Sequence, residues 1–124
     1  MFIEIDFESD EAIYRQLCHQ IIIGIATNTL QSGQSLPSVR DLAEEIGINM
    51  HTVNKAYSIL RQQGFLTVDR RRGAVVDVSC EKRDALEELK KDLTIVLAKA
   101  SCKQVTREDV HSLIDELYRE YGST

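Results

Sequence analysis

Apolar residues recur at helical spacing near the start of the chain. Tyr14, Leu17, Ile21 and Ile25 follow one another at intervals of three and four residues, as they would on one face of an α-helix. This pattern predicts a first helix over residues 11–27, preceded by an acidic arm. Polar sequence with a glycine follows the helix, so we expect a turn before the next element.

Two amphipathic helices joined by a short link are predicted next. Ser38 is suited to cap the first of them, and Asp41, three residues later, completes a capping-box pattern. Gly47 suits the left-handed conformation that ends a helix, while Asn49 is suited to cap the second helix and Gly64 to close it. The two apolar stripes consist of Val39, Leu42, Ala43 and Ile46, and of Val53, Ala56, Tyr57 and Leu60. Two such helices with a tight turn between them form a helix-turn-helix.

After these helices the sequence favours β-structure. Residues 65–68 and 74–78 are rich in β-branched and aromatic side chains, which predicts two strands. The five residues between the strands run Asp-Arg-Arg-Arg-Gly, and the glycine, Gly73, can adopt a positive φ. We therefore expect a hairpin with a basic tip, the wing of a winged helix-turn-helix.

The last third of the chain, from Glu81 to Gly122, predicts a helical hairpin. Its first helix has a coiled-coil-like seam, and Thr106 with Asp109 offers a capping box for the second. Two short helices cannot bury two apolar faces alone, so we expect a second copy of the chain to cover them. The predicted dimer surface consists of Leu86, Leu89, Leu93, Val96, Leu97, Leu113 and Leu117.

The predicted fold class is therefore mainly α with a small β-hairpin. We expect a winged helix-turn-helix domain over residues 1–78 and a two-helix dimerisation tail over residues 79–124. The longest apolar run, at residues 21–23, is far too short to span a bilayer, and the acidic N-terminus does not resemble a secretory signal. These features predict a cytoplasmic protein without a membrane partner.

The net charge of -5 hides an uneven distribution. Residues 34–76 contain six basic and four acidic residues and so carry +2, which leaves -7 for the rest of the chain. Salt limits the reach of exposed charges to about 8–10 Å, so local placement matters more than the total. The three cysteines and three histidines are scattered, which predicts no disulfide, metal or cofactor. The positive charge of residues 34–76 permits a polyanionic partner although the total charge is negative.

Double-stranded DNA is the partner that the helix-turn-helix predicts. The second helix of such a motif enters the major groove with its N-terminal residues facing base edges, and a basic wing suits phosphates or an adjacent groove. Asparagine can pair with adenine, threonine with either hydrogen-bonding group, and lysine or arginine with guanine or phosphate. The predicted DNA-contacting residues are Ser38, Arg40, Asn49, Met50, His51, Thr52, Asn54, Lys55, Arg70, Arg71 and Arg72.

Three ordered segments resemble the GntR family of bacterial regulators. They are Leu-Pro-Ser-Val-Arg-Asp-Leu-Ala at 36–43, Thr-Val-Asn-Lys-Ala-Tyr at 52–57, and Leu60 followed by Gly-Phe-Leu at 64–66. The short tail resembles the YtrA-like subfamily in its length and helix pattern. The resemblance covers roughly residues 13–78. Family wings commonly carry Gly-x-Gly followed by phenylalanine, whereas this chain has Arg71 at the first glycine and Val75 at the aromatic.

The resemblance implies a transcriptional regulator, with Gly73 of the wing added to the DNA-contacting residues. We expect a repressor that binds a palindromic operator as a homodimer. An alternative is a winged-helix protein-interaction module in a larger assembly, which an apolar or acidic recognition face would favour. No nucleophile–base grouping or phosphate-binding glycine loop is present, so we do not predict an enzyme. A small-molecule effector would have to bind between the tail and the winged domain, and no residue pattern identifies its pocket.

Overall fold

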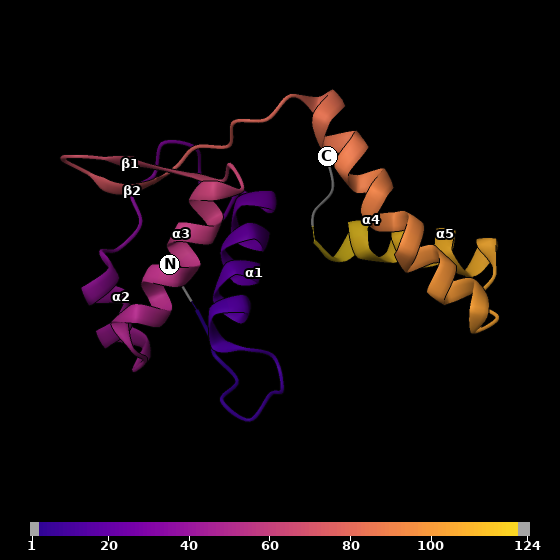
Figure 1. Ribbon diagram of the computed structural model, residues 1–124, viewed down its shortest axis with the longest axis horizontal. Coiled ribbons are helices and arrows are strands. Elements are labelled where there is room, and N and C mark those ends of the chain that lie inside the picture. The colour runs from indigo at the N-terminus through magenta and orange to yellow at the C-terminus, as the bar shows by residue number, and fades with distance from the viewer. Residues whose placement is uncertain (1–2, 122–124) are drawn as a thin grey trace. The chain divides into compact units, whose positions relative to one another are not determined.

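A computed structural model describes residues 3–121 and divides the chain into a first unit that ends at Ser79 and a second that begins at Cys80. The elements are α1 (Ile13–Ala26), α2 (Val39–Ile46), α3 (Met50–Gln62), β1 (Leu66–Asp69), β2 (Gly73–Val76), α4 (Lys82–Cys102) and α5 (Arg107–Glu120) (Figure 1). The predicted fold class, mainly helical with one small hairpin, is confirmed. None of the helices in the described range combines the length and apolar composition needed to cross a membrane.

The core of the first unit lies where α1 and α2 pack on α3 (Figure 1). Leu17 and Ile21 of α1 meet Val53 and Leu60 of α3, and all four side chains are fully buried. Leu42 of α2 is also fully buried. Burial of a large aliphatic side chain stabilises a fold by roughly 1.5–3 kcal/mol, so this contact holds α3 firmly.

The ends of α2 and α3 follow the predicted capping residues. The Ser38 hydroxyl accepts a hydrogen bond from the Asp41 N–H at 3.0 Å, and the Asn49 side chain accepts one from the His51 N–H at 2.7 Å. Gly47 ends α2 with φ of 82°, in the left-handed region that favours glycine. The capping box predicted at Ser38 forms only in part, because no reciprocal bond from its N–H to the Asp41 carboxylate is present in the described chain. The turn of the helix-turn-helix is therefore fixed at both sides.

The hairpin pairs β1 with β2 in an antiparallel register from Leu66 opposite Val76 to Asp69 opposite Gly73. The segment 33–36 lies along the other edge of β2, where the Leu36 N–H donates to the Ala74 carbonyl and the Val76 N–H to the Gln34 carbonyl, at 2.8 and 2.9 Å. β2 thus pairs on both sides. The strand ends at Val76, two residues earlier than predicted.

Two glutamines of α1 hold the N-terminal arm. The Gln16 side chain accepts from the Asp6 N–H at 2.9 Å and donates to the Asp6 and Glu11 carbonyls at 3.0 and 2.9 Å. Gln20 forms the same reciprocal pair with the backbone of Glu4. These side-chain amides make the hydrogen bonds to the backbone of the arm that a neighbouring strand would otherwise make, so the acidic arm lies along α1.

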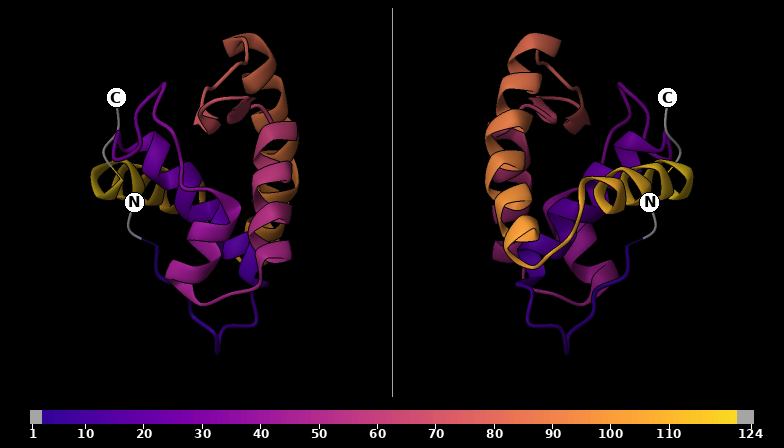
Figure 2. Two further views of the ribbon diagram at one scale, coloured as in Figure 1. Left: turned by 90° about the vertical axis from the view of Figure 1, so that its left-hand side faces the viewer. Right: turned by 90° about the vertical axis from the view of Figure 1, so that its right-hand side faces the viewer.

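The second unit consists of α4 and α5, which diverge from their connection instead of packing along their lengths (Figure 2). The predicted capping box is present in full at Thr106 and Asp109. The described part of this unit has no buried residue. Leu93 is half-buried, and the other predicted dimer-surface residues are exposed, namely Leu86, Leu89, Val96, Leu97, Leu113 and Leu117. The two helices expected in the tail are present, and nothing in the described unit covers their apolar stripes.

Candidate nucleic-acid interface

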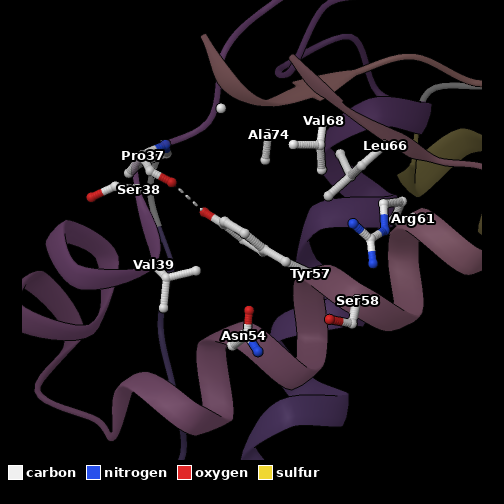
Figure 3. A pocket seen from close by; sticks show the side chains of 11 residues that line it. Pro37, Ser38, Val39, Asn54, Tyr57, Ser58, Arg61, Leu66, Val68 and Ala74 are labelled. Atoms are coloured by element: carbon white, nitrogen blue, oxygen red, sulfur yellow. Dashed lines mark hydrogen bonds between the residues drawn. The ribbon is translucent and has the colours of Figure 1, made fainter. Parts of the chain in front are cut away.

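Three parts of the first unit surround one concave surface: the start of α2, the outer side of α3 and the hairpin. The hollow has a volume of about 260 Å³ (Figure 3). The residues that line it are Pro37, Ser38, Val39, Asn54, Tyr57, Ser58, Arg61, Leu66, Val68, Gly73 and Ala74. An adjoining shallower hollow at the start of α3 is lined by Val39, Asn49, Met50, His51 and Asn54. We refer to these two hollows together as the groove face.

A polar stripe of α3 runs along the groove face. His51, Asn54, Ser58 and Arg61 are separated by three, four and three residues, which places them on one side of the helix. The predicted contacts Asn49, Met50, His51 and Asn54 are thus brought together. All four are exposed.

Arg40 is the second residue of α2, and its side chain is exposed. The Ser38 hydroxyl oxygen accepts the capping bond but retains its own hydrogen for donation to a ligand. The one salt bridge among residues 3–121 joins His19 to Glu11 on another part of the unit. Neither Arg40 nor Arg61, the arginine that lines the groove face, therefore forms a salt bridge with a carboxylate of the described residues.

The wing turn depends on Asp69. Its carboxylate accepts hydrogen bonds from the N–H groups of Arg71 and Arg72, at 2.7 and 3.2 Å, and these bonds lower the pKa of Asp69. Gly73 has φ of 74°, whereas Arg71 does not adopt a positive φ. The first glycine common in family wings is thus replaced by a turn that an aspartate side chain stabilises, and the Arg70 and Arg71 side chains are exposed.

Arg72 points back to its own protein. Its Nε donates to the Ser35 Oγ at 3.2 Å, and its Nη2 donates to the Gly33 carbonyl. Both acceptors lie in the segment that pairs with β2. In the unbound chain this side chain therefore ties the wing to the neighbouring segment.

Residues 13–76 match the family model described as bacterial regulatory proteins of the gntR family, which is about half of the chain. The chain belongs to the GntR family.

Relatives that span nearly all of this GntR chain include YtrA-like members, the subfamily predicted from the length and helix pattern of the tail. The transcriptional repressor YtrA of Bacillus subtilis (strain 168) is 30% identical over 118 residues, which cover 93% of this chain and 91% of that protein. The crystal structure of a transcriptional antiterminator from Listeria monocytogenes EGD-e has a TM-score of 0.86 at 26% identity and covers 100% and 96% of the two chains. YtrA from Sulfolobus acidocaldarius has a TM-score of 0.61 at 36% identity, with coverage of 98% and 100%.

A solved complex supports DNA as the partner of this fold. The DNA-binding domain of AraR, in complex with an operator, has a TM-score of 0.52 at 25% identity and covers 61% of this chain and 98% of its own. The chain is a GntR-family DNA-binding transcriptional regulator.

Two predicted contacts on α3, the recognition helix of this GntR protein, lie away from the groove face. Lys55 places its Nζ 3.9 Å from the centre of the Tyr14 ring on α1, in a cation–π contact. Thr52 is half-buried and also does not line either hollow. Thr52 directly follows His51, and Lys55 directly follows Asn54, both of which line the groove face. Neighbouring residues point to different sides of a helix, so the Thr52 and Lys55 side chains point away from it.

Two residues of the groove face were missed as contacts in the sequence. Ser58 and Arg61 come four and seven residues after Asn54, so the helical period alone could have extended the polar stripe to them. The predicted contacts of this helix lie only in its first turns. The structure extends the candidate surface to the last turn of α3.

Tyr57 forms the wall of the groove face between α2 and α3 (Figure 3). Its hydroxyl donates to the Pro37 carbonyl at 2.8 Å, directly before the N-cap of α2. Burial, with a smaller contribution from the Glu45 charge, raises the pKa of Tyr57 well above its ordinary value, so the phenol is neutral at physiological pH. This bond sets where α2 begins relative to the recognition helix.

Proposed function

We propose that this GntR regulator is a cytoplasmic, non-enzymatic repressor that binds a palindromic operator as a homodimer and occludes a promoter. The observation that carries the proposal is the groove face with its polar helix stripe, together with the exposed arginines of α2, α3 and the wing turn, which form no salt bridge among the described residues. An apolar or acidic face would have favoured a protein-interaction module instead.

Base reading is assigned to the start of α3. The Asn49, His51 and Asn54 side chains can exchange hydrogen bonds with base edges in the major groove, and Met50, 45% exposed, can contact a thymine methyl. Asn49 also caps α3, so its amide oxygen is engaged while its NH₂ group stays free to donate. Arg40 at the start of α2 suits a phosphate at the groove edge.

Phosphate contact by the wing is assigned to Arg70 and Arg71, with Gly73 allowing close approach of the backbone. Arg72 has a protein partner for its guanidinium in the unbound chain, and Lys55 has one for its ammonium group. We therefore assign these two residues to holding the wing and α3 in place, and Ser38 chiefly to capping α2.

The homodimer is assigned to the stripes of α4 and α5. Leucines at 86, 89, 113 and 117 are between 42% and 54% exposed in the single chain, although leucine is ordinarily a core residue. A second copy presents the same stripes, and a two-fold pair matches a palindrome with half-sites about 34–36 Å apart or a multiple of that.

The proposal is tested by fluorescence anisotropy with duplexes selected from the source genome, measured over a salt series. Each neutralised phosphate contributes about 0.9 to the slope of log K against log salt. Arg70→Ala with Arg71→Ala removes two contacts from each of two wings, so the slope should fall by roughly 3–4. The control is Arg119→Gln, on the side of α5 away from the apolar stripe, which should keep the wild-type slope.

Two results would contradict the proposal. The first is a wild-type protein that binds no genomic duplex even at low ionic strength. The second is a double variant whose salt slope equals that of the wild type, which would exclude the wing from the interface.

A further inference from the structure

We propose that Arg61 is a DNA phosphate contact at the end of the recognition helix, which joins the helix and wing contacts into one continuous track along the DNA backbone. The inference rests on the groove face proposed above as the DNA surface. Arg61 adds to that surface one cationic side chain that is not among the DNA contacts predicted from the sequence.

The position of Arg61 along α3 favours a phosphate over a base. Ten residues separate it from His51, and at 1.5 Å per residue the two side chains start about 15 Å apart along the helix axis. The major groove is about 12 Å wide. When the first turn of α3 lies at the base edges, the last turn is therefore at the level of the phosphates that border the groove.

The surroundings of Arg61 favour an anion. Of the eleven residues that line the hollow between α2, α3 and the hairpin, Arg61 alone is charged. Leu66, Val68 and Ala74 of the hairpin form an apolar wall on the same hollow (Figure 3). A cation beside apolar groups attracts an anion more strongly than one in open water, because the local dielectric is lower.

No salt bridge occupies the guanidinium within residues 3–121. Ser58, one turn earlier on the same stripe, presents a hydroxyl that can donate to the same phosphate. The wing shares the hollow through Val68 and Gly73, so a strand held by Arg61 can continue toward Arg70 and Arg71. A phosphodiester is the ligand that fits a forked, permanently charged donor at this place.

The test uses the full chain and a salt series with an operator duplex and a random duplex. Arg61→Gln should lower the salt slope by about 1.8, which is one contact from each protomer, and should weaken binding to both duplexes by the same factor. Arg61→Lys retains the charge and should keep the slope. Asn54→Ala should reduce the preference for the operator while leaving the slope unchanged.

Several results would overturn the inference. A wild-type slope for Arg61→Gln would mean that Arg61 only balances the dipole at the end of α3. Loss of operator preference at an unchanged slope would mean that it reads a base. Because the wild-type chain is measured on the same duplexes, failure of all binding would instead refute the proposed DNA surface itself.

Discussion

Replacement of Tyr57 by phenylalanine tests the link between α2 and the recognition helix. The ring of Tyr57 is 8% exposed and would stay in place, so the substitution leaves no cavity. It removes one hydrogen bond, from the hydroxyl to the Pro37 carbonyl at 2.8 Å. The perturbation is therefore confined to the bond that fixes the start of α2.

The expected loss of unfolding free energy is about 1 kcal/mol, the usual net contribution of a neutral hydrogen bond. Pro37 is half-buried and the bond is partly exposed, so we do not expect the larger penalty for a fully buried unpaired acceptor. For a unit of this size the loss corresponds to a fall in Tm of about 4–8 °C. DNA binding should weaken as well, because Arg40 follows Pro37 in the same segment.

Urea unfolding at pH 7, followed by circular dichroism, measures the effect. The matched control is Tyr118→Phe on α5, where the ring is 59% exposed and the change should stay within about 0.5 kcal/mol. A Tyr57→Phe protein as stable as the wild type at pH 7 would refute the role of the bond.

The pH dependence gives an independent check. Because burial raises the pKa of Tyr57 above its ordinary value of 10.0, the unfolded chain ionises before the folded one. The stabilising contribution is therefore complete below pH 10 and is lost as the pH rises above it. Phenylalanine cannot ionise, so the difference in unfolding free energy between the wild type and Tyr57→Phe should narrow in alkali. A constant difference across this range would contradict the buried phenol.

Further predictions concern the tail, the wing and the turn. Leu93→Asp should give monomers by light scattering and about half the salt slope, whereas Ile95→Asp, on the opposite side of α4, should remain dimeric. Arg72→Ala should speed amide exchange in the wing and leave the salt slope of DNA binding unchanged. Ser35→Ala should speed the same exchange to a smaller extent. If Arg72→Ala instead lowers the salt slope, Arg72 contacts DNA directly. Gly47→Ala should lower the unfolding free energy measured in urea by about 1–2 kcal/mol, because Gly47 has φ of 82°. Gly47→Asn should lower it less. Equal stability of the wild type and both variants would count against strain at this turn.

The helix-turn-helix was predictable because its rules are local. Ser38, Gly47 and Asn49 act on backbone groups within a few residues, and the structure has each of them in the predicted role. The strand lengths were less well predicted, because pairing with the segment 33–36 as well as β1 decides where β2 ends. The sequence near β2 does not indicate that the segment 33–36 pairs with it.

The candidate contacts were harder to predict because side chains have competing partners. Arg72 lies in a run of three arginines, and only the fold shows that Ser35, distant in sequence, accepts from its guanidinium. Lys55 was placed on the polar side of its helix, but the Tyr14 ring of α1 lies within reach. Such contacts depend on the tertiary arrangement and not on helical period.

The second unit has consequences for how the regulator responds to its own abundance. Its described helices gain little stability from burial within one chain, so on the proposed dimer their ordering and their association are a single equilibrium. The amount of binding-competent protein would then rise with the square of chain concentration at low copy number. Modest changes in synthesis or degradation would produce steeper changes in promoter occupancy than a preassembled regulator allows.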